Sequence, residues 1–246
     1  MPYVPLPHGR VHFAERGERR EGRASVVLIH GAGAGSAIWS MTLARVARAA
    51  HAVAIDLPGH GPSDQGDLPL DLGRYRDAVG LLAAALCLGP SLLVGHSMGA
   101  LVAIEAALAW PDKVRGLVLA AAAPRMPVDP QLLSLLATDP EAARVWLADH
   151  GLSPRAKPAV RRGLLAAGPG TPPHVTRADF ELVRATDLTA RLPALKCPTV
   201  WIDGADDRIV PAEARRGRSG EVIEVPDAGH LLPIEAPAAI AAAALA

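Results

Sequence analysis

The sequence predicts an α/β fold in which a mostly parallel sheet is covered by helices on both faces and interrupted by a helical insertion. Short, nearly continuous apolar stretches alternate with helical stretches up to about residue 121. Strands with this apolar character are buried on both faces, as in parallel sheets. The alternation stops between residues 125 and 190 and resumes at residue 198. With 246 residues, half of them hydrophobic, the chain is long enough for one large domain with an insertion.

The first half of the chain is expected to supply a hairpin and four parallel strands. Residues 3–5 and 10–14, joined at His8 and Gly9, are predicted to form an antiparallel hairpin at the sheet edge. We expect parallel strands at 25–30, 51–56, 91–95 and 114–121, with helices at about 36–49, 71–88 and 98–109. Two further strands, at 198–202 and 222–225, complete the sheet after the insertion.

The insertion at residues 125–190 contains four predicted helix starts. In the pairs Asp129-Pro130, Asp139-Pro140 and Ser153-Pro154 a capping side chain precedes a proline at the first helical position. The fourth start is at Thr176, where residues 176–179 resemble a capping box. We therefore expect a core made of residues 1–124 and 191–246, and an all-helical insertion that is not an independent domain.

The motif that carries most chemistry is Gly-His-Ser-Met-Gly at residues 95–99, between the apolar run 91–94 and an alanine-rich helical stretch. A serine hydroxyl is a poor nucleophile unless it is exposed, oriented and next to a base. A strand–turn–helix elbow meets these needs, because its glycines let strand and helix approach and the helix N-terminus directs free N–H groups at negative charge. Ser97 is the candidate nucleophile, and its alternative role is a helix N-cap.

An activated serine needs a base, an acid that orients the base, and donors for the oxyanion. The strand at 198–202 is followed by a loop with the candidate acids Asp203, Asp206 and Asp207, and the strand at 222–225 is followed by His230. A carboxylate and an imidazole that each follow a strand's carboxyl end can meet the serine at one sheet edge.

Two backbone N–H groups are candidates for the oxyanion hole. The glycine-rich loop at residues 30–36, which follows the first parallel strand, can direct the N–H of Ala32 toward the serine. The N–H of Met98, directly after the candidate nucleophile, is the expected second donor.

Together these motifs resemble those of the α/β-hydrolase fold superfamily, specifically its small capped esterases with an HG-x-G oxyanion loop. The loop at residues 56–64 (DLPGHGPSD) and the lead-in at 196–199 (KCPT) extend the resemblance over nearly the whole chain. The resemblance implies that the insertion at 125–190 is a cap over the nucleophile that shapes the substrate pocket.

The same resemblance assigns the catalytic roles. It implies Ser97 as nucleophile, His230 as base and Asp207 as the orienting acid. In the family the aspartate lies three residues after a glycine and four before a proline, which favours Asp207 over Asp206, whereas Asp203 lies before the turn.

Five further residues are predicted to contact the substrate, because they lie in the cap or beside the catalytic segments. Arg125, near the cap entrance, belongs either to a solvated basic face or to a site for an acidic substrate group. The predicted substrate-binding residues are Trp39, Leu231, Met126, Trp146 and Arg125.

The resemblance implies a serine hydrolase that cleaves small carboxylic esters through an acyl-enzyme without a cofactor. C–C bond hydrolases or lyases and cofactor-free haloperoxidases or perhydrolases use the same triad, and a non-catalytic ligand-binding member of the fold is a further alternative. Residues 31–36 and Asp56 also resemble a dinucleotide-binding fingerprint. Its third glycine is replaced by Ser36, however, and a Pro-Gly-His-Gly loop unlike a ribose site follows Asp56.

Composition limits the partners. The net charge is zero with both signs interspersed, which argues against binding to nucleic acid or to an anionic membrane surface. No two histidines have a spacing typical of zinc sites, so no metal is expected. The N-terminus lacks a signal pattern and no apolar run reaches about 18 residues, so we expect a cytoplasmic protein. The expected partner is a small-molecule ester, and the sequence does not reveal the oligomeric state.

Overall fold

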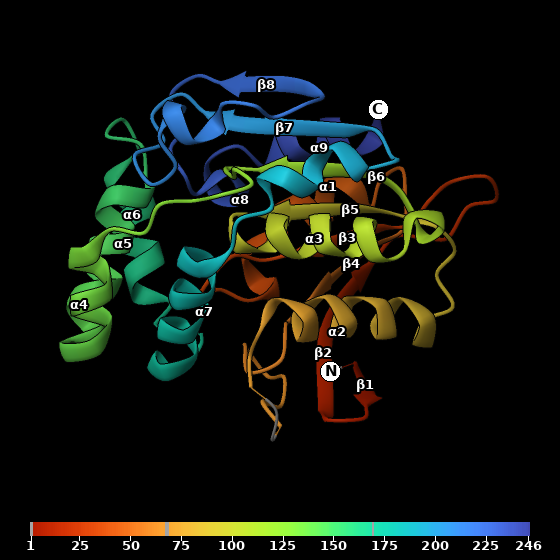
Figure 1. The fold of residues 1–246 in the computed structure, drawn as a ribbon, viewed down its shortest axis with the longest axis horizontal. Helices are drawn as coiled ribbons and strands as arrows, with labels where there is room; N and C mark the ends of the chain where they lie inside the picture. The colour runs from red at the N-terminus through yellow and green to blue at the C-terminus, as the bar shows by residue number, and fades with distance from the viewer. Residues whose placement is uncertain (1, 67–68, 169) are drawn as a thin grey trace.

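The computed structural model describes residues 2–66, 69–168 and 170–246. Within these residues eight strands form one sheet in the order β1-β2-β4-β3-β5-β6-β7-β8 (Figure 1). The strands are β1 Tyr3–Leu6, β2 Gly9–Arg16, β3 Val26–Ile29, β4 Ala52–Ile55, β5 Ser91–His96, β6 Val114–Ala120, β7 Thr199–Gly204 and β8 Glu221–Val225. The β1–β2 and β2–β4 pairs are antiparallel and all others are parallel, which confirms the predicted mostly parallel α/β fold.

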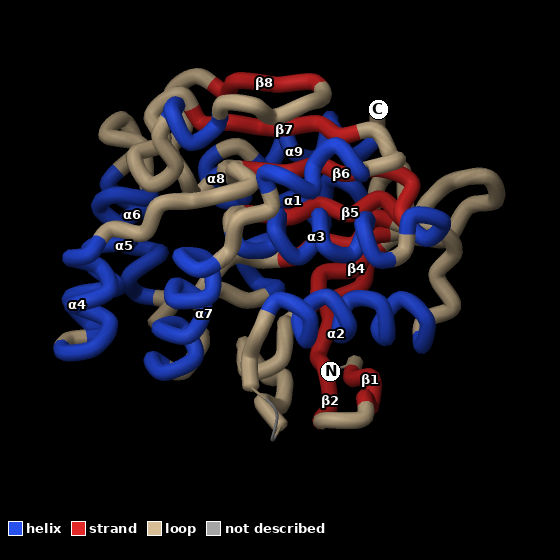
Figure 2. The backbone as a smooth tube through the Cα atoms, in the orientation of Figure 1, coloured by secondary structure: helices blue, strands red, loops and turns tan. Residues whose placement is uncertain are grey.

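Helices cover both faces of this sheet (Figure 2). The α-helices are α1 Ser40–Val46, α2 Leu72–Ala85, α3 Met98–Ala109, α4 Pro130–Thr138, α5 Pro140–Gly151, α6 Pro158–Ala166, α7 Pro173–Ala185, α8 Leu232–Glu235 and α9 Pro237–Leu245. Short 3-10 helices occupy Ser36–Trp39, Pro111–Lys113, Thr189–Ala194 and Ala212–Arg215. None of the helices in the described part of the chain is both long and apolar enough to cross a membrane.

The core consists of two layers, one on each face of the sheet. One cluster joins the sheet to α2 and α3 and includes Tyr75 and Leu101, and the other joins it to α1 and α9 and includes Trp39 and Ile240. Every residue of β3 and β4 is buried, as expected for central strands covered on both faces. Complete burial of one large apolar side chain stabilises the fold by about 1.5–3 kcal/mol, so these two layers make the sheet a rigid frame for the loops at its ends.

Helices α4 to α7 lie together beyond the carboxyl ends of β5, β6 and β7 (Figure 1). The chain leaves the core and returns to it side by side, because the Leu188 N–H donates to the carbonyl oxygen of Pro124 at 2.9 Å and Arg125 pairs with Asp187 in a β-bridge. We call residues 125–190 the cap, and its limits stay a prediction.

Two of the predicted helix starts in the cap are wrong. No helix begins at Pro154, because Lys157 precedes Pro158 and is held extended at φ −60° and ψ 136°. A helix begun at Pro154 would end there, so α6 begins at Pro158 instead. The fourth helix begins at Pro173 rather than at Thr176, since proline is favoured at the first helical position.

Candidate active site

Ser97 occupies a strained turn between β5 and α3. Its φ of +52° and ψ of −119° are rare for a residue with a Cβ and cost about 1–3 kcal/mol. The flanking glycines make the turn possible. A Cβ on Gly95 would clash with the carbonyl oxygen of Gly99, and a Cβ on Gly99 would clash with the carbonyl oxygen of Ile29. The strand and helix therefore approach closely and leave the Ser97 side chain half-buried at the carboxyl end of the sheet.

His230 and Asp207 come together in the loops that follow β8 and β7. The Nδ1 atom of His230 lies 3.1 Å from Oδ2 of Asp207, and both side chains are almost completely buried. The other carboxylate oxygen of Asp207 accepts the N–H groups of Ile209 and Val210 at 2.8 and 3.0 Å. Burial would raise the pKa of Asp207, but His230 and these N–H donors outweigh it and lower the pKa. The carboxylate is therefore held ionised beside the imidazole.

The two other candidate acids have partners of their own. Asp206 accepts a hydrogen bond from the Ser153 hydroxyl at 2.6 Å and pairs with Arg155. Asp203 pairs with Arg218, which donates to its Oδ1 atom at 2.9 Å. Among these three aspartates, all of which lie in the described part of the chain, Asp207 is the one that contacts His230.

The loop that carries His230 lies directly beside the elbow. His96, which precedes Ser97, has its Nε2 atom 2.9 Å from the carbonyl oxygen of His230, and the centroids of the two rings are 5.1 Å apart. Burial, and then the neighbouring His230, lower the pKa of His96 to about 3, so its ring is neutral at pH 7. The Nε2 atom must carry the proton and donate it to this carbonyl. His96 thus fixes the backbone of the candidate base.

The glycine-rich loop after β3 packs against the same elbow. A Cβ on Gly31 would lie 3.1 Å from the Cβ of Ser97, so the two backbones are in close contact here. Residues 31–34 form a turn in which the Ala34 N–H donates to the carbonyl oxygen of Gly31 at 3.2 Å, with φ of +64° at Gly33. Among the described residues, no hydrogen-bond acceptor faces the N–H of Ala32 or of Met98.

A carboxylate of the cap also reaches this loop. Asp179 of α7 is completely buried and accepts the Gly33 N–H at 2.9 Å, and Tyr75 and His60 complete its contacts. The capping-box prediction assigned Asp179 to the start of a helix, so the sequence analysis missed this contact. The available signal was an aspartate on the apolar side of α7, next to Phe180.

The five predicted substrate-binding residues occupy different environments. Trp39 and Met126 are buried within core clusters, whereas the Leu231 side chain lies against Gly151 at the end of α5. Trp146 stacks on the ring of His150 at 3.9 Å, and Arg125 is 75% exposed with Asp187 at 3.9 Å. Contact of these side chains with a substrate stays a prediction.

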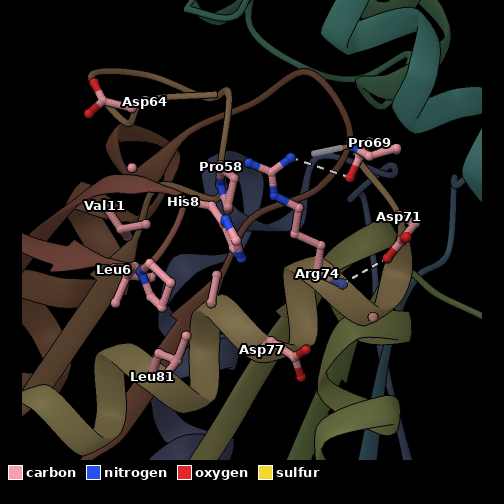
Figure 3. Close-up of a pocket in the computed structure, with 14 residues that line it drawn as sticks. Leu6, His8, Val11, Pro58, Asp64, Pro69, Asp71, Arg74, Asp77 and Leu81 are labelled. Carbon is pink, nitrogen blue, oxygen red and sulfur yellow. Dashed lines mark hydrogen bonds between the residues drawn. The ribbon is translucent and has the colours of Figure 1, made fainter. Parts of the chain in front are cut away.

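A cavity of about 420 Å³ lies away from Ser97, between the β1–β2 turn and α2 (Figure 3). Its walls include Leu6, Val11 and Leu81, with His8 and Arg74 beside them. None of the predicted catalytic or substrate-binding residues lines it. The arrangement of acid, imidazole and serine therefore locates the candidate site at the cap side of the sheet, and this cavity is a separate feature.

Comparison with known families agrees with the fold. The profile of the Alpha/beta hydrolase family matches residues 26–243. The chain therefore belongs to the α/β-hydrolase family, and the predictions of this fold and of an ester-hydrolysing enzyme are confirmed at this level of description.

Two curated relatives are about one-third identical to this chain over the residues that align. The dihydrolipoyllysine-residue acetyltransferase component of the acetoin cleaving system of Pseudomonas putida is 31% identical over 88% of this chain, which spans only 61% of that protein. The pimeloyl-(acyl-carrier protein) methyl ester esterase of Stenotrophomonas maltophilia (strain K279a) is 32% identical over 83% of this chain and 85% of its own length.

A solved structure of similar shape is the enol-lactonase from Burkholderia xenovorans LB400. The comparison gives a TM-score of 0.86 with 22% identity, and it covers 98% of this chain and 97% of the lactonase. At this identity the likeness establishes the fold alone.

Proposed function

We propose that the protein is a serine hydrolase that cleaves small carboxylic esters through an acyl-enzyme, with Ser97, His230 and Asp207 as its triad. The observation that carries the proposal is the hydrogen bond between Asp207 and His230, whose loop lies beside the strained elbow that presents Ser97. An imidazole oriented by a buried carboxylate and placed next to a serine is the arrangement that generates a nucleophilic hydroxyl.

In the first half of the reaction, His230 Nε2 accepts the Ser97 proton as the Oγ atom attacks the ester carbonyl. The Asp207 carboxylate holds the Nδ1 proton of His230 and stabilises the imidazolium that forms. The carbonyl oxygen becomes an oxyanion, which the N–H groups of Ala32 and Met98 bind. When the tetrahedral intermediate collapses, the C–O bond breaks and the alkoxide leaves with the proton from His230.

In the second half, water hydrolyses the acyl-enzyme. His230 removes a proton from the water as its oxygen attacks the acyl carbon, and the same two N–H groups bind the second oxyanion. Collapse of this intermediate releases the carboxylic acid and returns the proton to Ser97. Since both halves pass through an oxyanion at the same position, one pair of donors serves both.

The relatives support an ester or another activated acyl group as the substrate class. The methyl ester esterase is named for cleavage of a carboxylic ester, and 83% of this chain aligns with it. We propose that Trp39, Met126, Leu231 and Trp146 contact the substrate. Arg125, at the cap entrance, receives an acidic substrate group.

A panel of p-nitrophenyl esters of increasing acyl length, assayed with the wild type and with Ser97→Ala, tests the proposal. We expect Ser97→Ala to lower kcat by about 10³-fold or more, because triad members act as a unit. Ser91→Ala is the matched control, since Ser91 is a buried serine at the other end of β5. Near-native ester hydrolysis by Ser97→Ala would show that the proposed mechanism is wrong.

A further inference from the structure

Asp179 is a carboxylate of the cap whose three hydrogen bonds come from three distant segments of the core. Its Oδ1 atom accepts the hydroxyl of Tyr75, on α2, at 2.6 Å. Its Oδ2 atom lies 2.7 Å from Nε2 of His60, in the loop after β4, and accepts the Gly33 N–H at 2.9 Å. The side chains of Asp179 and His60 have no exposed surface. A buried carboxylate with this many donors is held in one position.

His60 contacts Asp179 through one ring nitrogen and a backbone carbonyl through the other. The Nδ1 atom of His60 lies 3.1 Å from the carbonyl oxygen of Pro58, and its Nε2 atom faces Asp179, so both ring nitrogens face oxygen acceptors. A buried polar group is tolerated only when it is hydrogen-bonded, so Asp179 and His60 each supply a partner that the other needs in the core.

The cap contacts the oxyanion loop at more than one point. The Thr171 hydroxyl, ahead of α7, donates to the carbonyl oxygen of Ala34 at 2.9 Å. The side chain of Thr176, on α7, fills the space beside Gly33 where a Cβ would lie. Residues 171–179 therefore enclose the turn at 31–34 from the cap side, and Asp179 supplies its charged contact.

From these contacts we infer that Asp179 is a positioning residue: it anchors the oxyanion loop through the Gly33 N–H, so that the oxyanion hole is formed only when the cap is seated on the core. This inference rests on the proposed function, because it assigns the Ala32 N–H a role in binding the oxyanion. Asp179 itself does not touch the reacting atoms, and it acts through the loop.

The backbone of the turn explains why an anchor is needed. Glycine adopts positive and negative φ with similar ease, so Gly33 by itself does not fix the orientation of the peptide groups around it. The carboxylate of Asp179 selects one orientation by accepting the Gly33 N–H. The neighbouring Ala32 N–H is then left without an acceptor among the described residues, and it is available to a developing oxyanion.

The test compares the kinetics of Asp179→Asn and Asp179→Ala with those of the wild type on one p-nitrophenyl ester. We expect Asp179→Ala to lower kcat by about 100-fold with KM changed less than about twofold, since the lost interaction is made in the transition state. Asp179→Asn retains one oxygen that can accept the Gly33 N–H, so it should restore most of this loss. The inhibition constant of an alkyl boronic acid, which forms a tetrahedral adduct with Ser97, should rise by the same factor as kcat falls.

Two control variants separate positioning from a loss of stability. Ser91→Ala removes a buried hydroxyl at the far end of β5, and Glu105→Gln alters a buried carboxylate of α3 that pairs with Arg191. Both should keep kcat within about threefold of the wild type even where their melting temperatures fall as far as those of the Asp179 variants. Amide exchange of Gly33, followed by NMR, should accelerate in Asp179→Ala and not in Glu105→Gln.

The outcomes are distinguishable. If the Asp179 variants match the controls in kcat and in boronic acid affinity while Ser97→Ala is inactive, this inference is overturned and the proposed function stands. If the wild type shows no turnover that depends on Ser97, the proposed function fails and the catalytic part of the inference fails with it. In that case the amide exchange rate of Gly33 tests only whether Asp179 anchors the loop. An unchanged exchange rate in Asp179→Ala would overturn this part of the inference as well.

Discussion

Asp203, at the end of β7, and Asp206 and Asp207, in the loop after it, differ in the side chain that each contacts most closely. Asp203 pairs with Arg218 and holds the β7 end, whereas Asp206 accepts the hydroxyl of Ser153 and ties the loop to the cap. Asp207 alone of the three faces the imidazole of His230. Three carboxylates close together in the chain therefore differ in their contacts because the elements packed around each one differ.

Asp207→Asn should lower kcat by about 10³- to 10⁴-fold and leave the fold intact. An asparagine of the same shape presents an amide to His230 and favours the wrong imidazole tautomer for proton transfer. Asp206→Asn is the matched control and should keep kcat within about tenfold. The comparison requires only steady-state kinetics on a chromogenic ester, and equal losses in the two variants would contradict the assignment of Asp207.

At the residue level the sequence predicts the candidate triad better than it predicts the buried residues that contact the loops around it. Ser97 and His230 stand in motifs with fixed spacing, and the choice of Asp207 needs only the distances to a glycine and a proline. Asp179 could not be found in this way, because an aspartate after a threonine near a helix start has the pattern of a capping box. Its partners Gly33, His60 and Tyr75 lie 104 or more residues away, and only the fold brings them together.

At the scale of elements, the contact between β3 and the start of α3 sets the geometry of the elbow. Gly99→Ala should destabilise the protein by about 1–3 kcal/mol, because its Cβ would clash with the backbone of Ile29 and neither element can move easily. Gly163→Ala is a matched control in α6, where nothing lies within 4 Å of the added methyl group. It should stabilise the protein by about 0.5–1 kcal/mol. Urea unfolding of both variants measures the two opposite signs.

Glu235 joins the histidine loop to the cap. Its two carboxylate oxygens accept the Ser153 N–H at 2.8 Å and the Gly229 N–H at 3.0 Å. Glu235→Gln should destabilise the protein by about 1–3 kcal/mol, because the amide nitrogen of glutamine cannot accept one of these N–H groups. Glu224→Gln, on the exposed edge strand β8, is the control and should be neutral in thermal unfolding. If Glu235→Gln is as stable as the wild type, the two hydrogen bonds of Glu235 contribute nothing to the free energy of unfolding.

The wrong prediction of a helix start at Pro154 is explained by contacts between the cap and the core. Pro154 and Pro158 both satisfy the local rule for a first helical residue, and the sequence alone does not show which one a helix uses. Ser153 is taken by Asp206 and Glu235 of the core, so the chain turns there and begins α6 at Pro158. Predictions from local sequence patterns hold for the strands that are buried on both faces. They fail where a polar contact with a distant segment determines the residue at which a helix begins.

At the scale of the whole molecule, two layers of helices exclude water from a group of histidines at the centre of the fold. His30 and His96 are both completely buried, at the carboxyl ends of β3 and β5. Burial, and then the charge of His60, lower the pKa of His30 to about 3, and burial and His230 lower that of His96 to about 3. The native protein thus keeps both rings neutral at a pH where the unfolded chain protonates them.

Stability should consequently fall when the pH is lowered from 7 to 4.5. The unfolded histidines have a pKa near 6.5, so the stabilisation is complete above that value and is lost progressively as the pH falls toward 3. Each histidine contributes a slope of up to about 1.4 kcal/mol per pH unit. The raised pKa of Glu235 has the opposite sign, because its native form takes up a proton first. Urea unfolding at pH 7, 6, 5 and 4.5 measures the slope. In His96→Gln, whose amide can still donate to the carbonyl of His230, unfolding should take up about one proton fewer. The slope of the unfolding free energy against pH should therefore decrease by up to about 1.4 kcal/mol per pH unit. An unchanged slope would mean that a different group causes the acid sensitivity.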